Sequence, residues 1–307
     1  MWGYSLFILI ITTSELKKRF KGAWKSYRAC RLCPRSCGID RTKNEVGFCK
    51  ARLDAKIYSY RQYMGEEPPI SGTKGSGVIF FSHCTMKCIY CQNYKFSQNG
   101  AGYPVTADIL SKAMLSLKMS GCHNINLVTP SHYLPSILES LLLAKESSLD
   151  IPIVYNTSGY ESKEALELLD GVVDIYLADM RYCDNNLSRI YSMSEDYVDV
   201  NRSAILTMHG QVGGLILDEE GRAKRGLIIR HLVLPNLLSN TERVLRYIAE
   251  HLPNNTYISL MSQYIPLYKA RENPEIARPI TKKEYEAACG MLDKYNLRHG
   301  WIQPLTF

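Results

Sequence analysis

The sequence predicts an α/β protein built on a parallel sheet, preceded by a small cysteine-rich segment. From about residue 75 onward, short apolar runs typical of strands alternate with stretches of helical periodicity, as parallel βα units do. Seven of the ten cysteines fall in the first third of the chain, in two tight groups. Six βα repeats with short connections fit either a doubly wound sheet or a partial barrel.

The N-terminal region is expected to contain one amphipathic helix. Its apolar residues recur at helical spacing, namely Leu16, Phe20, Ala23, Trp24 and Tyr27. Basic residues lie between them, so we expect a helix packed on the main body with a solvated basic face, rather than an RNA-binding face. The apolar segment 1–13 is shorter than the roughly 20 residues of a membrane span. Its basic residues follow it, whereas a secretory signal carries them in front, so we expect a buried or docked segment, with a signal or anchor as the alternative.

The repeats then follow in order along the chain. Strands are expected at 78–81, 124–128, 153–155, 173–177, 227–233 and 257–261, and helices at 107–119, 134–145, 163–169 and 241–251. A longer helical and loop region precedes the fifth strand. No Gly-x-Gly-x-x-Gly motif follows the first strand, so a Rossmann dinucleotide site loses its main support. We divide the chain into an N-terminal segment, 1–72, and a main unit, 73–307.

Composition excludes several classes of protein. A hydrophobic fraction of 46% and a charged fraction of 22% are those of an ordinary globular chain, not of a disordered or collagen-like one. The net charge of +7 mildly favours acidic partners without indicating nucleic acid. A chain of this length needs no disulfide bonds, so the clustered cysteines indicate metal or cluster ligation in a reducing compartment. We therefore expect a cytoplasmic protein with no membrane span, and the composition does not favour a nucleic-acid partner.

The group after the first strand is Cys84, Cys88 and Cys91, a C-x3-C-x2-C spacing. Three thiolates can bind three irons of a [4Fe–4S] cluster and leave the fourth iron open to another ligand. An amine and a carboxylate at one end of a molecule would chelate that iron. S-adenosylmethionine has such an end beside its sulfonium, which an electron from the cluster can cleave. The alternatives are three unrelated core cysteines or a zinc site completed from elsewhere.

The other group is Cys30, Cys33, Cys37 and Cys49. Four cysteines within twenty residues indicate a closed four-thiolate site, which would hold either structural zinc or a second iron–sulfur cluster. Zinc is redox-silent, whereas a cluster would relay electrons. The remaining cysteines have no partner spacing and are expected to be buried thiols: Cys122, Cys183 and Cys289.

Several stretches together resemble the radical S-adenosylmethionine superfamily and, within it, the PflX-like branch of pyruvate formate-lyase-activating-enzyme homologues. They are CRLCPRSCGIDR (30–41), CTMKCIYCQN (84–93), INLVTPSHYLP (125–135), NTSGY (156–160), DMRY (179–182), RHLVLPN (230–236) and SLMSQYIP (259–266). The resemblance implies a partial (β/α)6 radical SAM barrel, a [4Fe–4S] cluster and bound S-adenosylmethionine. It also implies an electron donor of the flavodoxin or ferredoxin type and a glycyl radical enzyme as a partner.

In barrels of parallel strands, chemistry takes place at the carboxyl ends of the strands. The resemblance implies cofactor-binding roles for residues near those ends, namely Tyr90, Thr129, Ser131, His132, Asn156, Ser158, Asp179, Arg181, Arg230, Gln263 and Tyr264. Three of them depart from the activating enzymes: His132 replaces an acidic residue, Asn156 an aspartate and Arg181 a lysine. Because side chains alternate along a strand, Arg230 is expected to face the barrel interior and His231 the other side.

The expected function is that of a radical enzyme. It would cleave S-adenosylmethionine reductively to a 5′-deoxyadenosyl radical, which abstracts hydrogen from a glycine of a partner enzyme, from a small molecule or from RNA. The rival class is a non-catalytic iron–sulfur electron carrier. The open iron counts against the rival, because a carrier gains nothing from it. Apart from the cofactor-binding set, the sequence assigns no catalytic residue.

Overall fold

The structure is a computed structural model that describes residues 11–305. Most of the apolar segment 1–13 therefore lies outside the described residues. Ile11, at its end, is 8% exposed and joins the core. No helix within residues 11–305 is long and apolar enough to cross a membrane.

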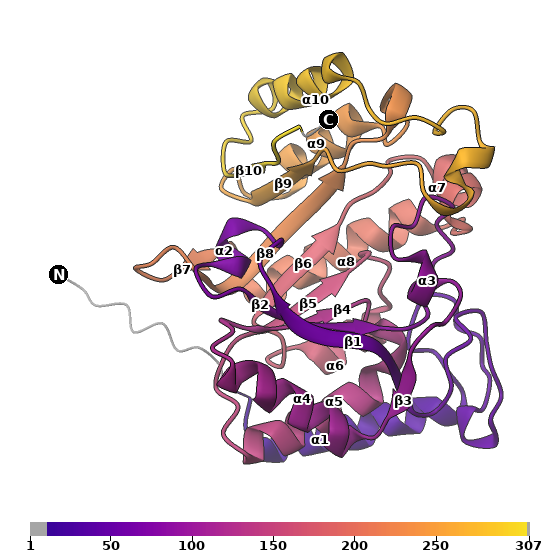
Figure 1. Cartoon of the computed structure of the whole chain (residues 1–307), viewed down its shortest axis with the longest axis vertical. Coiled ribbons are helices and arrows are strands. Elements are labelled where there is room, and N and C mark those ends of the chain that lie inside the picture. Colours follow the sequence, from indigo (N-terminus) through magenta and orange to yellow (C-terminus); the bar gives the residue numbers. More distant parts are fainter. Residues whose placement is uncertain (1–10, 306–307) are drawn as a thin grey trace.

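The strands form one sheet in the order β10-β9-β8-β6-β5-β4-β2-β1-β3, with β7 paired to β8 (Figure 1). The ladders from β2 to β10 along this order are parallel, and those of β1, β3 and β7 are antiparallel. The parallel strands are β2 (Ser76–Phe81), β4 (Ile125–Val128), β5 (Ile153–Thr157), β6 (Ile175–Asp179), β8 (Ala223–Leu232), β9 (Tyr257–Met261) and β10 (Gly300–Ile302). The antiparallel strands are β1 (Ala55–Tyr63), β3 (Tyr103–Val105) and β7 (Ile216–Leu217).

Helices connect successive parallel strands, which confirms the predicted α/β fold. The helices in chain order are α1 (Thr13–Lys25), α2 (Pro68–Ser71), α3 (Tyr94–Ser97), α4 (Ala107–Met119), α5 (Leu134–Glu146), α6 (Lys163–Leu169), α7 (Asn185–Ser192), α8 (Tyr197–Val212), α9 (Thr241–His251) and α10 (Lys282–Lys294), of which α1 and α2 precede the first parallel strand. Short 3-10 turns lie at Ser26–Arg28, Arg41–Lys43, Ser131–Tyr133, Pro235–Leu237 and Tyr268–Glu272. Hydroxyl side chains accept hydrogen bonds at the N-termini of α1, α4, α6 and α10, where helix N–H groups lack other partners.

The sheet is open, as expected of a partial barrel, because its two end strands, β3 and β10, do not pair with each other in the described part of the chain. All six predicted strands belong to the parallel run, and β10 extends it. Beneath the polar strand ends, a small apolar cluster packs between strands and α2, and includes Ile70, Val154, Leu177 and Ile228.

The N-terminal segment packs against the main unit through α1, which lies along α5, and through β1, which pairs with β2. Leu16, Ala23 and Tyr27 are buried, and the Tyr27 hydroxyl lies 3.1 Å from that of Ser136 in α5. The predicted amphipathic helix is therefore confirmed as a packed helix. Strand β1 pairs with β2, so part of the 1–72 segment adds to the sheet of the main unit, and the division at residue 72 stays a prediction.

Candidate functional site

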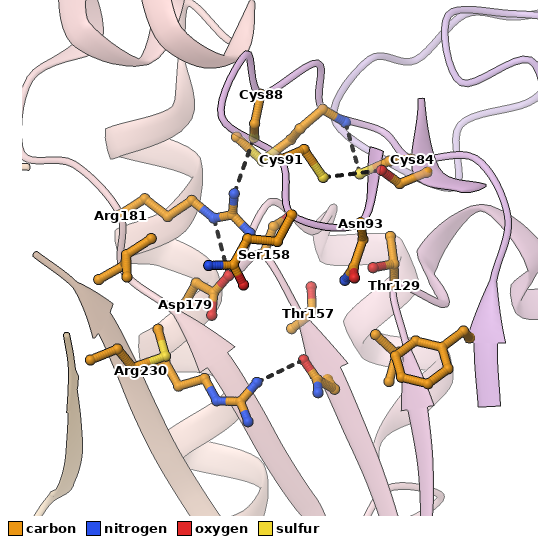
Figure 2. A pocket seen from close by; sticks show the side chains of 18 of the residues that line it. Cys84, Cys88, Cys91, Asn93, Thr129, Thr157, Ser158, Asp179, Arg181 and Arg230 are labelled. Carbon is orange, nitrogen blue, oxygen red and sulfur yellow. Dashed lines mark hydrogen bonds and ion pairs between the residues drawn. The ribbon is translucent and has the colours of Figure 1, made fainter. Parts of the chain in front are cut away.

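A cavity of about 310 Å³ opens at the carboxyl ends of the parallel strands. Three cysteines, three arginines and a ring of strand-end polar residues line it (Figure 2). Most of the residues for which a cofactor role was expected are among them: Tyr90, Thr129, Asn156, Ser158, Asp179, Arg181, Arg230 and Gln263. The fold thus brings together, at one opening, residues that are up to 173 positions apart.

Cys84, Cys88 and Cys91 lie on the loop that follows β2, and all three line the cavity (Figure 2). Each sulfur lies near a hydrogen-bonding group. The Met86 N–H donates to Cys84 Sγ at 3.4 Å, and Cys91 Sγ lies 3.1 Å from the Ser97 hydroxyl. Burial raises the pKa of Cys84 to about 12 and also raises that of Cys91. Their thiolates therefore need a nearby cation to form at neutral pH.

The sulfur of Cys88 accepts two hydrogen bonds. Arg181 Nη1 and Ser192 Oγ each donate to it at 3.0 Å. The Ser192 hydroxyl in turn accepts from the Tyr182 hydroxyl at 2.8 Å, and the Tyr182 hydroxyl oxygen lies 2.5 Å from that of Tyr90. A connected polar chain therefore links the cluster loop to α7 and to the segment after β6.

Within residues 11–305, no three His, Cys, Asp or Glu side chains converge closely enough to hold a single metal ion. The fit of Cys84, Cys88 and Cys91 to a cluster therefore rests on donor chemistry. All three are thiols, they face one cavity, and donors and a guanidinium surround their sulfurs. Hydrogen bonds to sulfur and nearby positive charge stabilise an iron–sulfur cluster and its thiolates.

Arg181 connects the cluster loop to the end of β6. Its Nε and Nη2 donate to Asp179 Oδ2 at 3.0 and 2.6 Å, while Nη1 reaches Cys88. Burial alone would lower the pKa of Arg181, but the neighbouring Cys88 and Asp179 raise it overall. The guanidinium therefore stays charged beside the cysteine loop.

The backbone bends sharply where β4 ends. Thr129 has φ +59°, a conformation that β-branched residues rarely adopt. The turn Ser131–Tyr133 follows at once. Thr129 lines the cavity, but Ser131 and His132 do not.

Ser131 and His132, which follow this bend, have other partners. Ser131 Oγ donates to Glu161 at 2.5 Å, and His132 Nε2 lies 2.8 Å from the Ser82 carbonyl oxygen. Burial lowers the pKa of His132 to about 3, so its imidazole is neutral. Tyr264 is also outside the lining and donates to the Ile276 carbonyl.

Arg230 faces the cavity and His231 faces away, so the predicted strand register is confirmed. The imidazole of His231 contacts the Met180 carbonyl at 2.7 Å and the Thr241 hydroxyl at 3.0 Å. Arg230 lies farther from the cysteine loop than Arg181 does (Figure 2). Its Nη1 donates to Asn156 Oδ1 at 3.4 Å.

The sequence analysis missed two carboxylates that bind Arg230. The Nε and Nη2 of Arg230 each donate a hydrogen bond to one carboxylate oxygen of Glu67, both at 2.6 Å, and Nη2 also contacts Glu66. Burial raises the pKa of Glu66, whereas for Glu67 the guanidinium outweighs burial and lowers the pKa. The only signal in the sequence is the adjacent acidic pair before Pro68, since Arg230 lies 163 residues away.

The four N-terminal cysteines do not line this cavity. Cys30, Cys33 and Cys49 are buried and Cys37 is exposed. Backbone hydrogen bonds join Cys30 to Ile39 at 2.9 Å and to Gly38 at 3.0 Å. These bonds close a tight loop that turns back on itself between Cys30 and residue 39.

Comparisons with known proteins agree with this geometry. The family model described as "Radical SAM superfamily" matches residues 78–200. "Uncharacterized protein MJ0674" of Methanocaldococcus jannaschii is 34% identical over 282 residues, which cover 88% of this chain and 76% of that protein. A solved structure titled "Crystal structure of methylornithine synthase (PylB)" aligns over 97% of this chain and 76% of its own, with a TM-score of 0.50 and 15% identity. At that identity the likeness concerns the fold alone.

Proposed function

Because the chain belongs to one family with the archaeal protein MJ0674 and carries a radical SAM superfamily domain, we propose that it is a radical SAM enzyme whose cluster binds at Cys84, Cys88 and Cys91. The observation that carries the proposal is the cavity itself. Three thiols from one loop and a ring of strand-end polar residues face the same space. Three thiolates leave one iron of a [4Fe–4S] cluster without a protein ligand, and the cavity gives S-adenosylmethionine access to it.

A cluster held by these cysteines would supply one electron, which would cleave the sulfonium bond of S-adenosylmethionine into methionine and a 5′-deoxyadenosyl radical for hydrogen abstraction. The protein's own work is to bind, orient and shield. We assign cofactor contacts to the lining residues of the expected set, which are Tyr90, Thr129, Asn156, Ser158, Asp179, Arg181, Arg230 and Gln263. We assign none to Ser131, His132 or Tyr264, which lie outside the lining.

Two of the three cavity arginines, Arg181 and Arg230, support different tasks in this proposal. Arg181 hydrogen bonds to Cys88, and its charge favours the thiolate and the reduced cluster. Arg230 already pairs with Glu66 and Glu67, so binding the methionine carboxylate would require it to share its guanidinium with them. This shared use makes Arg230 a weaker anchor for the carboxylate than a free arginine would be.

The resemblance to the PflX-like branch supports hydrogen abstraction from a glycine of a partner enzyme, with reduction by a flavodoxin or ferredoxin. A small molecule or RNA as hydrogen donor is the alternative within the same class, and a non-catalytic electron carrier is the alternative outside it.

Anaerobic reconstitution with iron and sulfide, followed by S-adenosylmethionine and dithionite, tests the proposal. We expect 5′-deoxyadenosine from the wild type, even without a substrate. Cys84→Ala, Cys88→Ala and Cys91→Ala should each lose both this product and the absorption of the barrel cluster, whereas Cys289→Ala, outside both cysteine groups, should retain both. Cleavage retained in any of the first three variants would overturn the ligand assignment, and no product from the wild type would favour the carrier.

A further inference from the structure

We propose that Cys30, Cys33, Cys37 and Cys49 hold a second [4Fe–4S] cluster, which passes single electrons to the cluster of the barrel. The relay rests on the proposed function, because it needs that cluster as its acceptor. The metal content of the N-terminal site is independent of it and is tested separately.

The guanidinium of Arg41 is a positive charge buried beside two of these cysteines, and it has no carboxylate partner among the described residues. Arg41 is 2% exposed, and its Nη2 lies 3.1 Å from Cys30 Sγ and 3.7 Å from Cys49 Sγ. Its Nη1 donates to the His132 carbonyl at 2.6 Å, and its Nε has no partner among the described residues. Every hydrogen bond that Arg41 makes within residues 11–305 thus goes to a thiol or a carbonyl, not to a carboxylate.

An arginine remains charged when it is buried, and an unpaired buried charge is costly. Neutral thiols cannot balance it. Four thiolates around a zinc ion or an iron–sulfur cluster carry net negative charge, which a guanidinium at this distance offsets. Arg41 thus places an unpaired buried positive charge against the sulfurs of Cys30 and Cys49, where a metal centre bound by these cysteines would supply the compensating negative charge.

The local backbone is also adapted to the sulfur atoms. The Ala51 N–H donates to Cys49 Sγ at 3.5 Å. A Cβ at Gly47 would lie 2.8 Å from Cys37 Sγ, too close for any side chain, so glycine at this position leaves room for the sulfur. Such N–H···S contacts and close backbone approach are typical of thiolate sites.

The loop of this site contacts the loop of the barrel cluster directly. Arg35, between Cys33 and Cys37, donates from Nε to the Thr85 carbonyl at 3.1 Å, and Thr85 directly follows Cys84. The Nη2 of Arg35 donates to the Oγ of Ser194, in the segment after α7, at 2.7 Å. One arginine side chain therefore spans the distance between the two cysteine loops.

A second cation lies between the same two loops. The ammonium of Lys87, which precedes Cys88, lies 5.5 Å from the ring centre of Phe48, which precedes Cys49. Arg35 stacks on the same ring at 3.9 Å. Positive charge beside a cluster favours its reduced form. Arg35 and Lys87 would therefore favour the reduced form of both the N-terminal cluster and the barrel cluster.

The four cysteines differ in how far they are exposed to solvent. Cys37 is exposed, whereas Cys30, Cys33 and Cys49 are 4%, 5% and 4% exposed. The site thus has one cysteine at the protein surface and three cysteines buried beneath it. Zinc suits the same four thiolates but is redox-silent, and it would make no use of this placement. A cluster would accept an electron at the exposed side and deliver it inward.

Each step of the relay moves one electron. A low-potential donor of the flavodoxin or ferredoxin class is oxidised by one electron and the N-terminal cluster is reduced. That cluster is then reoxidised as it reduces the barrel cluster. No covalent bond forms or breaks, and no proton is transferred.

Metal analysis of the reconstituted wild type is the first test. We expect about eight irons and eight sulfides per chain, the content of two [4Fe–4S] clusters. Cys37→Ser, which changes the exposed ligand, and Cys33→Ser, which changes a buried one, should each contain about four irons. Cys289→Ser should match the wild type. About four irons in the wild type, with or without one zinc, would overturn the proposal.

The second test separates the relay from the barrel chemistry. With dithionite, a small reductant that reaches the barrel cluster directly, Cys37→Ser should form 5′-deoxyadenosine within about twofold of the wild-type rate. With flavodoxin hydroquinone as the only reductant, its rate should fall by at least about tenfold. Equal rates with flavodoxin would overturn the relay. Loss of activity with both reductants in the wild type would instead contradict the proposed function.

Discussion

Arg230 carries the most concentrated charge network in the cavity. Its guanidinium contacts Glu66, Glu67 and Asn156, from the β1–α2 loop and from β5. Removing one partner of a buried ion pair leaves an uncompensated charge, which is much more costly than a lost surface pair. Here two carboxylates share one guanidinium, so the arginine determines the stability of both.

Arg230→Ala should therefore destabilise the protein by about 3–5 kcal/mol, because two buried carboxylates lose their cation. Arg230→Lys should restore only part of this, since an ammonium cannot form the two-pronged pair with Glu67. Denaturant unfolding measures both. Arg61→Ala, an exposed arginine of the same cavity, should change the free energy of unfolding by less than about 0.5 kcal/mol. If Arg230→Ala changed the free energy of unfolding as little as Arg61→Ala does, the ion pairs of Arg230 would not stabilise the fold.

Glu161 is a buried carboxyl held by hydroxyl groups. Ser131, Thr157 and Tyr155 all donate to it. Burial raises its pKa to about 7 from the ordinary value of 4.5. The folded protein therefore binds this proton more tightly than the unfolded chain does. The resulting stability is fully present below about pH 4.5 and is lost as the pH rises through about 7.

Glu161→Gln removes this titration and keeps an oxygen that can accept hydrogen bonds. The free energy of unfolding of the wild type, relative to the variant, should fall by at most about 3 kcal/mol as the pH rises from 4.5 to 8. Denaturant unfolding across this range provides the measurement. A difference that does not change with pH would show that Glu161 titrates normally.

The local sequence pattern predicts the direction of a single side chain only where that residue lies in a regular helix or strand. The alternation along β8 predicted the opposite directions of Arg230 and His231, and both are confirmed by their contacts. Alternation ends with the strand, however. The bend at Thr129 turns Ser131 and His132 away from the cavity, and no pattern in the sequence signals that bend.

Among the elements, those with strong periodicity were predictable. The six parallel strands and helices α4, α5, α6 and α9 lie close to their predicted positions. Strand β1 was not predicted, because its exposed and half-buried residues follow no clean alternation. Strand β10 is three residues long, too short for any periodic signal. The missed β1 precedes the loop that supplies Glu66 and Glu67.

Helix α1 is a test of packing at the level of an element. Leu16 is fully buried and α1 packs along α5. Leu16→Ala should cost about 2–5 kcal/mol of stability, through lost burial and the cavity left behind. Lys17→Ala, on the exposed face, should change stability by less than about 0.5 kcal/mol. Thermal or denaturant unfolding compares the two, and equal effects would show that α1 is not docked.

On the scale of the whole molecule, the fold joins two cysteine groups that the sequence separates. Spacing alone predicted that each group forms a site, because ligands on one loop are local. It could not predict that the loops touch. That contact depends on how the N-terminal segment packs beside the loop after β2, through Arg35 and Phe48. Long-range packing of this kind has no counterpart in local periodicity.

A cluster bound at Cys84, Cys88 and Cys91 would have one iron open to S-adenosylmethionine. Electron paramagnetic resonance of the dithionite-reduced Cys37→Ser variant, with and without S-adenosylmethionine, tests whether that iron is open. In this variant the barrel cluster is expected to be the only source of the signal. We predict that S-adenosylmethionine changes the g values of the reduced cluster, and that the change is absent with an analogue of S-adenosylmethionine from which the α-amine has been removed. A spectrum that S-adenosylmethionine leaves unchanged would contradict the account.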